Sequence, residues 1–186
     1  LDQAHGNQFT REELATLDGL LAARGLRVQP LAEGELTEAL RAATALVVVA
    51  PVNGYSPAEA QAVSDLVARG GRVLLVGDPT RYNIEIDEAD IFAAPIIATA
   101  QVPLNDLANA FDITFRGDYL YNTVENEGNF RNILVGGDGL GDSALTERLE
   151  RLALYSSHSL QLGPSAAALL SADDNTWSSA TDRPGG

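Results

Sequence analysis

Seven polar residues have the types and positions that could carry chemistry in this sequence. Asp2, His5 and Asn7 lie in the opening segment LDQAHGN, and the other four follow two apolar runs, residues 46–50 and 72–76. The seven candidates are Asp2, His5, Asn7, Asn53, Tyr55, Asp78 and Thr80. A histidine between two carboxylates can act as a general base or as a metal ligand. The alternative is that Asp2 and Asp78 cap turns and that His5 packs a loop, because position in a fold is weak evidence of activity.

The elements that must position these residues are a strand, a helix and a strand over residues 45–80. Residues 46–50 and 72–76 are unbroken apolar runs, which is typical of parallel strands covered on both faces. Between them Ser56 and Glu59 form a capping box, and Gly70-Gly71 ends the helix. Strands joined by such a helix should be parallel, and ligands usually bind beyond their carboxyl ends. The seven side chains are therefore expected to share one sheet edge.

The rest of the first half is also predicted to alternate between helices and strands. Residues 10–25 carry a capping box, a leucine repeat and a final glycine, which predict a helix. Residues 26–31 alternate like a half-buried strand, and residues 36–43 predict a short helix. We expect the first strand to lie mostly before Leu1 or to be very short. This order predicts an α/β fold with three layers, a flavodoxin-like, mostly parallel sheet with helices on both faces.

The second half is expected to complete the same domain. Residues 82–101 combine an acidic cluster with an apolar run and predict an excursion followed by a short strand near residue 96. A helix is expected at 104–111, and Asp142 is expected to cap another that carries Leu145, Leu149 and Leu152. Strands are expected at 112–116, 118–122, 133–135, 154–162 and 166–171. We expect one domain over residues 1–172 and a polar linker or tail over residues 173–186.

Composition excludes several classes of function. The 186 residues carry a net charge of −14, with twelve scattered basic residues, which argues against nucleic-acid binding and against electrostatic docking onto anionic membranes. The chain has no cysteine, so it has no disulfide, no thiolate metal site and no cysteine nucleophile. No stretch is long enough to span a bilayer or to act as a signal peptide. Any membrane anchor would therefore lie outside these residues.

Other motifs are weaker candidates. Residues 136–141 (GGDGLG) lie between a predicted strand and a predicted helix, but Asp142 occupies the last glycine position of a phosphate loop and Asp138 adds charge. A plain glycine-rich turn is favoured, and no cofactor is expected. The acidic clusters could bind calcium weakly, yet none fits an EF-hand loop, and solvated surface charge is favoured. No G-x-S-x-G nucleophile elbow is present.

A series of short motifs carries a family resemblance over nearly the whole chain. They are Asp2-x-x-His5-Gly6-Asn7 with Phe9-Thr10, Gly70-Gly71, Gly77-Asp78-Pro79, Leu104-Asn105-x-Leu107, Phe111-x-Ile113, Tyr119-x-Tyr121-Asn122 and the segment from Ser171 to Trp177. In this order they resemble the class I glutamine-amidotransferase-like domains of GldG-like auxiliary proteins of ABC-type transport systems and of related membrane-anchored proteins.

The resemblance implies a flavodoxin-like domain at the extracytoplasmic face of a membrane, tethered by segments outside this chain, with membrane-protein or transporter subunits as partners. It implies no amidotransfer, because that chemistry needs a cysteine where this chain has Asp78 or a neighbour. We therefore expect a non-catalytic binding or assembly domain. Two alternatives stay open: a metal-assisted hydrolase that uses Asp2, His5 and Asp78, and a sensor of a small ligand or glycan in the same cleft.

Overall fold

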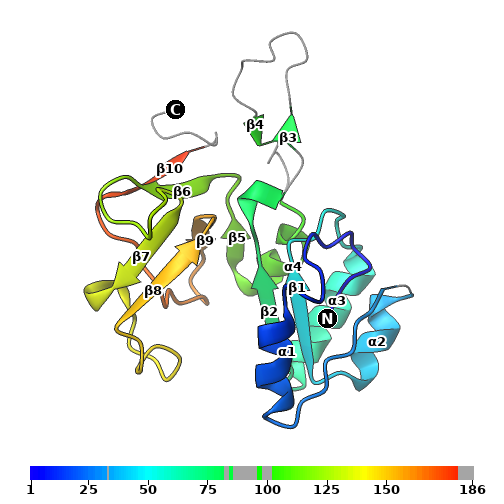
Figure 1. Ribbon diagram of the computed structural model, residues 1–186. Helices are drawn as coiled ribbons and strands as arrows, with labels where there is room; N and C mark the ends of the chain where they lie inside the picture. Colours follow the sequence, from blue (N-terminus) through cyan, green and yellow to red (C-terminus); the bar gives the residue numbers. More distant parts are fainter. Residues whose placement is uncertain (33, 82–83, 86–95, 98–101, 180–186) are drawn as a thin grey trace. The chain divides into compact units, whose positions relative to one another are not determined.

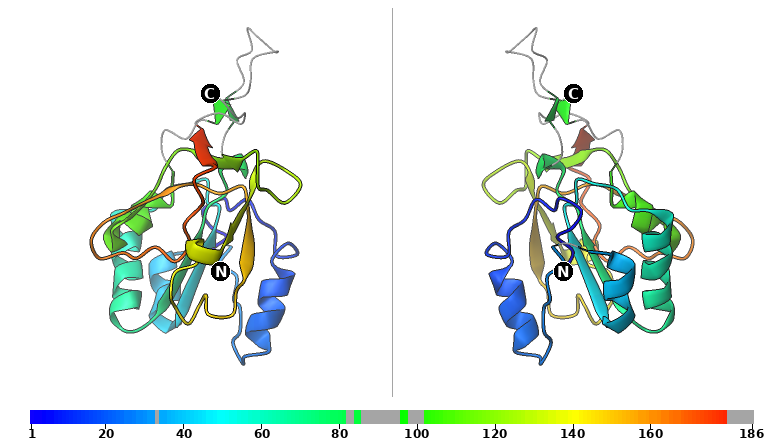
Figure 2. Two further views of the ribbon diagram at one scale, coloured as in Figure 1. Left: turned by 90° about the vertical axis from the view of Figure 1, so that its left-hand side faces the viewer. Right: turned by 90° about the vertical axis from the view of Figure 1, so that its right-hand side faces the viewer.

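The computed structural model describes residues 1–32, 34–81, 84–85, 96–97 and 102–179 (Figures 1 and 2). It divides the chain into two compact units. The first unit comprises Leu1–Gly77 and Pro103–Ala110, and the second comprises Asp78–Val102 and Phe111–Gly186. Each unit is described by itself below.

The centre of the first unit is the predicted crossover. Strand β1 (Ala45–Val49) pairs in parallel with β2 (Arg72–Val76), in a register that sets Ala45 opposite Arg72 and Val49 opposite Val76. Helix α3 (Pro57–Ala68) connects them and begins at a capping box in which Ser56 and Glu59 bond each other's backbone. The prediction of two parallel strands joined by a helix is confirmed, because the apolar runs and the cap specify it locally.

Three more helices complete this unit: α1 (Ala15–Ala22), α2 (Leu36–Ala42) and the short α4 (Asn105–Ala108). In both views of Figure 2, α1 lies on one side of the β1–β2 pair and α2 and α3 lie on the other. The core on the α2 and α3 side is fully buried and consists of aliphatic side chains from β1, from the helices and from Leu104 at the start of α4. Its most buried members are Leu36, Leu40, Leu46, Val48, Val63, Leu66, Leu104 and Leu107.

The first residues of the chain are also part of this unit. Asp2 forms a parallel bridge with Leu31, and its backbone N–H donates to the carbonyl oxygen of Val47 at 2.9 Å. Residues 26–30, predicted as a strand, form no regular strand, and only Leu31 is bridged. The chain therefore starts between β1 and the segment that ends at Leu31.

The second unit is built from antiparallel pairs. Its ladders join β3 (Ile84–Glu85) with β4 (Ile96–Ile97), β5 (Ile113–Phe115) with β9 (Leu160–Leu162), β6 (Tyr119–Asn122) with β10 (Thr176–Ser179), and β7 (Asn132–Gly136) with β8 (Arg151–Tyr155). Short 3₁₀ turns occur at η1 (Pro79–Arg81), η2 (Asn109–Phe111) and η3 (Gly137–Gly139), of which the second spans the boundary between the units.

The expected flavodoxin-like, mostly parallel sheet is wrong. The strands that the structure describes form two-stranded ladders, of which β1–β2 alone is parallel. Burial alternates along β7, where Ile133 and Val135 are buried and their neighbours are not, and such half-covered strands favour antiparallel pairing. The helix predicted after Asp142 does not form, since residues 144–148 are turns and Leu145 is 75% exposed. Without that crossover helix, β7 and β8 pair directly as antiparallel neighbours.

Other differences are local. Of residues 166–171, predicted as a strand, only Leu170 is paired, in a bridge with Leu140. Most of the predicted excursion at 82–101 lies outside the described residues, as do residues 180–186 of the predicted tail, whereas Thr176–Ser179 forms β10. The division into one domain and a tail stays a prediction.

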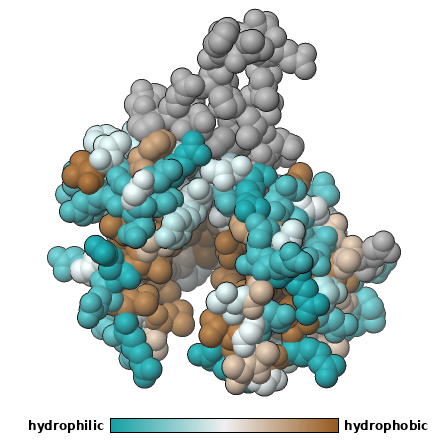
Figure 3. Space-filling view, in the orientation of Figure 1, coloured by the Kyte–Doolittle hydropathy of each residue, from teal (hydrophilic) through white to brown (hydrophobic). Residues whose placement is uncertain are grey.

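Two further features are the hydropathy of the surface and the length of the helices. Hydrophilic side chains cover much of the face of each unit drawn in Figure 3. No helix in the described ranges is long and apolar enough to cross a membrane.

Candidate functional site

His5 bridges two carboxylates at the carboxyl end of β1. Its Nδ1 lies 2.9 Å from Asp2 Oδ2 and 3.1 Å from Asp2 Oδ1, and its Nε2 lies 3.3 Å from Glu59 Oε1. Asp2 is 1% exposed and His5 is 9% exposed. Charge-assisted contacts of this kind strengthen when water is excluded. The three side chains therefore form an acid–imidazole–acid row in which Asp2 and His5 are buried and Glu59 is partly exposed.

Tyr55 contacts both Asp2 and His5. Its hydroxyl donates to Asp2 Oδ2 at 2.5 Å, and its ring stacks on the imidazole of His5 with centroids 4.0 Å apart and 28° between the planes. Burial raises the pKa of Tyr55 above its usual value, and the hydrogen bond to Asp2 and the nearby negative charges raise it further. The hydroxyl is therefore a permanent donor to Asp2.

Glu59 carries a second set of hydrogen bonds from the helix cap. Its Oε2 accepts from the backbone N–H of Ser56 at 2.8 Å and from the Ser56 hydroxyl at 2.7 Å. Burial by itself would raise the pKa of Glu59, but the bonds from Ser56 and the contact with His5 outweigh it, so the pKa is lower than usual. Glu59 therefore holds α3 and the His5 loop together as a carboxylate.

Backbone hydrogen bonds fix the loop that carries His5. The carbonyl oxygen of His5 accepts from the N–H groups of Val52 and Asn53, both at 3.0 Å. The next residue, Gly6, has φ of +67°, in the left-handed region where glycine is favoured. The Ala4 N–H donates to Asp2 Oδ1 at 3.0 Å. These hydrogen bonds and the left-handed turn at Gly6 therefore hold the His5 side chain next to Asp2.

Asn7 and Asn53 lie beside this cluster. Asn7 Nδ2 donates to the Val49 carbonyl oxygen at 3.1 Å, and Asn7 Oδ1 is buried with no hydrogen-bond partner among the described residues. Asn53 is exposed, and its Nδ2 lies 3.2 Å from the position that a Cβ on Gly6 would occupy. Five of the seven predicted residues thus belong to the first unit and lie around the end of β1.

Asp78 and Thr80 belong to the second unit and form their own local motif. Asp78 Oδ1 accepts from the Thr80 N–H at 2.9 Å and from the Thr80 hydroxyl at 2.6 Å, and Asp78 Oδ2 lies 3.5 Å from Arg81 Nε. These contacts make an Asx turn that starts η1. The structure therefore gives Asp78 and Thr80 a turn-forming role of their own.

Two residues of the cluster are missing from the sequence prediction. Glu59 was identified only as part of the capping box, and Asp106, on α4, was not considered, although its Oδ2 accepts from the Tyr55 N–H at 2.8 Å. A signal for Glu59 did exist, because the first turn of a crossover helix lies at the carboxyl edge of the strand before it. Asp106 comes from a distant part of the chain, and no local pattern points to it.

The remaining candidates do not form a reactive centre. In the described part of the chain, no group of three or more His, Asp or Glu side chains is placed to hold a metal ion. The glycine-rich segment packs against the backbone of residues 168–171, since a Cβ on Gly141 would lie 3.1 Å from the carbonyl oxygen of Ala168. His158 is buried, which lowers its pKa, and its Nδ1 lies 3.0 Å from the Asp118 carbonyl oxygen. These features favour structural roles.

Comparisons with known proteins locate the chain among families and folds. Residues 14–175 match the family model described as "Domain of unknown function (DUF4350)". A solved structure of the mmIFT52 N-terminal domain superposes with a TM-score of 0.72 at 17% identity, over 95% of this chain and 78% of that one. At that identity the likeness concerns the fold alone. No curated protein matches the sequence.

Proposed function

Because the chain belongs to the DUF4350 family, whose description assigns no activity, we propose from its own residues that it is a non-catalytic binding or assembly domain. The observation that carries the proposal is that both ring nitrogens of His5 already contact carboxylates of the same chain. A general base needs a nitrogen within hydrogen-bond reach of its substrate. Here Asp2 and Glu59 take up both positions, and Tyr55 covers one face of the ring.

The contacts within the cluster of Asp2, His5, Tyr55 and Glu59 are better suited to a rigid binding surface than to a catalytic site. The cluster ties together the loop that carries His5, the loop after β1 and the first turn of α3 through Asp2, Tyr55 and Glu59. A satisfied buried polar network fixes one arrangement of the segments that it joins. The carboxyl edge of β1 is therefore held in a single conformation, as a surface that recognises a partner requires.

The family resemblance of the sequence motifs supports the proposed location and partners. Their resemblance to GldG-like domains favours a protein associated with a membrane on its extracytoplasmic side, with transporter or other membrane-protein subunits as partners. The chain has no cysteine that could act as the nucleophile of an amidotransfer reaction.

A direct assay tests the non-catalytic part. The purified chain and its His5→Gln variant are screened against ester, phosphate and glycoside substrates, with and without added Zn²⁺, Mg²⁺ and Mn²⁺. We expect no turnover that differs between the two proteins. A metal-dependent activity that is lost in His5→Gln would instead establish the hydrolase alternative. The assembly part is tested by capture from detergent-solubilised membranes, and recovery of no transporter or envelope subunit would contradict it.

One observation favours a second candidate, a sensor of a small polar ligand. Asn7 Oδ1 is buried without a hydrogen-bond partner in the described residues, and the exposed side chain of Asn53 lies at the same edge. An unpaired acceptor gains when a ligand supplies a donor. Thermal-shift hits from a library of sugars and amides should disappear in Asn53→Ala and persist in Gln61→Ala, a control on the outer face of α3. Equal hits in both variants would count against the sensor.

A further inference from the structure

The loop after β1 carries the one Asn-Gly pair in the sequence, Asn53-Gly54. Asparagine is a thermolabile residue, because the backbone nitrogen of the next residue can attack its side-chain carbonyl carbon, Cγ. Glycine favours this attack, since it has no Cβ to restrict the backbone. The sequence therefore places the most reactive neighbour directly after Asn53, and the way in which the fold holds the pair decides its reactivity.

The reacting groups of the pair are accessible. Both residues are exposed, so water can reach them. Within the described residues, neither the Asn53 side-chain amide nor the Gly54 N–H has a hydrogen-bond partner. The Asn53 Nδ2 lies beside Gly6, 3.2 Å from the position that a Cβ there would occupy. The Gly54 nitrogen can therefore attack Cγ without the loss of a hydrogen bond to the described part of the chain.

The residues on either side of the reacting groups are anchored. The Asn53 N–H donates to the His5 carbonyl oxygen at 3.0 Å, and the Tyr55 N–H donates to Asp106 Oδ2 at 2.8 Å. The same Asp106 oxygen would lie 2.6 Å from a Cβ on Gly54. A side chain at position 54 would push Asp106 away from the Tyr55 N–H. The geometry of this loop therefore depends on the glycine that makes Asn53 reactive.

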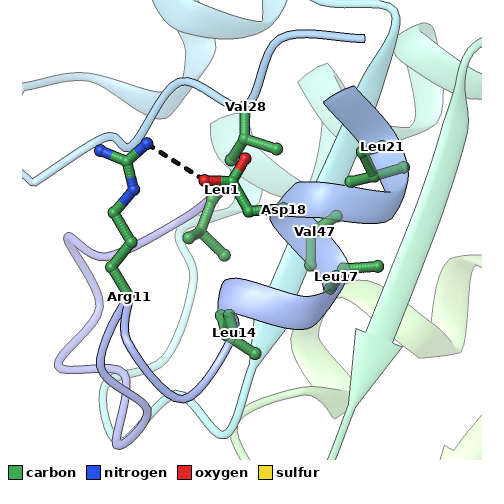
Figure 4. Close-up of a pocket in the computed structure, with 8 residues that line it drawn as sticks. All are labelled: Leu1, Arg11, Leu14, Leu17, Asp18, Leu21, Val28 and Val47. Atoms are coloured by element: carbon green, nitrogen blue, oxygen red, sulfur yellow. Dashed lines mark hydrogen bonds and ion pairs between the residues drawn. The ribbon is translucent and has the colours of Figure 1, made fainter. Parts of the chain in front are cut away.

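Asp18-Gly19 shows how the fold protects a comparable pair. Aspartate followed by glycine can form the same cyclic product, but both residues lie in α1, where backbone N–H groups are bonded along the helix. The Asp18 carboxylate is also held, because its Oδ2 lies 3.2 Å from Arg11 Nη2 (Figure 4). Asn53-Gly54 lies in a loop, and its reacting groups have neither restraint among the described residues.

We propose that Asn53 is a site of spontaneous deamidation. The Gly54 nitrogen forms a bond to Asn53 Cγ, the bond from Cγ to Nδ2 breaks, and ammonia leaves with the proton of the Gly54 N–H. Water then opens the resulting succinimide ring. Cleavage between the nitrogen and Cγ gives aspartate, and cleavage between the nitrogen and the backbone carbonyl carbon gives isoaspartate. The reaction consumes water, needs no cofactor or oxidant, and does not rest on the binding role proposed above.

The two products should affect the carboxyl edge of β1 differently. Aspartate keeps the main chain and adds a negative charge to a loop that already contacts Asp106. Isoaspartate lengthens the main chain by one carbon, about 1.5 Å, between the hydrogen bonds to His5 and Asp106. Those two bonds cannot then both keep their geometry, and we expect the Tyr55 hydroxyl to lose its bond to Asp2. Isoaspartate formation therefore loosens an edge that is rigid in the unmodified chain.

Mass spectrometry of the full chain tests the reaction. After incubation in mildly alkaline buffer, the peptide that contains Asn53 should gain the mass difference between an amide and an acid, with an equal amount of ammonia released. Asn175, which is exposed but precedes the β-branched Thr176, is the internal control and should not change over the same period. Asn53→Gln should release no ammonia above that background. Conversion of Asn53 no faster than that of Asn175, or equal ammonia from Asn53→Gln, would overturn the proposal.

A comparison with the unfolded chain tests whether the folded loop itself reacts. Asn53 should be converted in the folded chain at a rate comparable to that in urea. Slowing of roughly tenfold or more on folding would show that the reaction needs local unfolding, and would overturn the proposal.

The isoaspartate product tests the predicted effect on the loop. This form is separated by chromatography and identified with a methyltransferase that acts on isoaspartyl carboxylates. Its Tm should lie about 2–4 °C or more below that of Asn53→Asp, as expected for the loss of a buried hydrogen bond. The variant carries the same charge without the added main-chain carbon, so equal Tm values would overturn the effect assigned to isoaspartate.

Discussion

Both ring nitrogens of His5 lie near carboxylates of the same chain. Nδ1 contacts Asp2 at 2.9 Å and Nε2 contacts Glu59 at 3.3 Å. In the folded chain, the ring positions that a His between two acids could offer to a substrate or a metal are therefore already occupied by its own side chains. This is why we favour a binding or assembly role.

The Tyr55 hydroxyl should contribute measurably to stability. Tyr55→Phe removes the donor at 2.5 Å from Asp2 and leaves a buried carboxylate oxygen with one bond fewer. A loss of about 1–3 kcal/mol in the free energy of unfolding is expected, the usual range for an unsatisfied buried group. Urea denaturation measures it. Tyr155→Phe, at a ring that is 64% exposed, is the control and should change little. Equal midpoints for the two variants would contradict the role given to Tyr55.

Glu59 should make the stability of the chain depend on pH in the acid range. Its pKa in the folded chain is lower than the ordinary value of 4.5, so the folded state favours the carboxylate. The resulting stabilisation is fully present above pH 4.5 and is lost as the pH falls through the lower, folded value. Glu59→Gln keeps the capping geometry but removes the titration.

Unfolding free energies measured between pH 6 and pH 3 test this expectation. The wild-type chain should lose more stability over that range than Glu59→Gln does. Glu12→Gln, at an exposed carboxylate, should instead follow the wild-type curve. Parallel curves for wild type and Glu59→Gln would show that the carboxylate is not selectively stabilised in the folded chain.

The sequence was informative about the site where one strand and its helix determine it. Asp2, His5 and Tyr55 meet because they flank the end of β1, which the apolar run 46–50 located correctly. Asp106 joins through α4, from a part of the chain that no local pattern links to Tyr55. Sequence periodicity describes what one element buries, and it does not describe which distant element supplies a hydrogen bond.

At the scale of elements, the start of α3 is specified by Ser56. Its hydroxyl accepts from the Glu59 N–H at 3.3 Å while Glu59 bonds back to it, so Ser56→Ala should cost about 0.5–2 kcal/mol. Ser64→Ala is a control within the same helix, where the serine hydroxyl donates to the Ala60 carbonyl oxygen. Alanine is favoured at such a position, so this variant should be neutral or slightly stabilising. Equal losses in both would contradict the capping role.

The end of α3 is specified by two glycines for different reasons. Gly70 has φ of +89° and open space around its Cβ position, so Gly70→Ala should cost about 1 kcal/mol from backbone strain alone. A Cβ on Gly71 would lie 2.6 Å from the Leu66 carbonyl oxygen, a backbone atom of the helix. Gly71→Ala should therefore destabilise the chain more than Gly70→Ala, as measured by denaturant midpoints. The reverse order would contradict this account.

The elements also show where prediction of the fold failed and why. The β1–α3–β2 crossover was predicted because its strands are uninterrupted apolar runs and its helix carries both caps. The same pattern does not hold in the second half, where β5 to β10 are strands of three to five residues with mixed burial. Pairing of such strands depends on register with distant partners, as between β5 and β9, and the sequence gives no local signal for it.

For the whole molecule, the dominant global property is charge. A net charge of −14 on 186 residues implies repulsion among carboxylates in the folded chain. Close ion pairs offset part of it, for example Arg11 with Asp18 at 3.2 Å and Arg41 with Glu38 at 2.9 Å, both on partly or largely exposed side chains. Such exposed pairs contribute about 0–1 kcal/mol each, so the remaining repulsion is relieved mainly by salt.

Salt should therefore stabilise this chain. A comparison of Tm in NaCl and in CaCl₂ distinguishes the screening of surface charge from the binding of calcium at a specific site. Raising NaCl from about 10 mM to about 150 mM shortens the Debye length from ~30 Å to ~8 Å, so Tm should rise by a few degrees. CaCl₂ at matched ionic strength should raise Tm by a similar amount if the acids are solvated separately. Because solvated surface charge is the favoured interpretation of the acidic clusters, we expect no saturating calcium response. A Tm increase that saturates at micromolar CaCl₂ would contradict this expectation, because screening depends on ionic strength and does not saturate at that concentration.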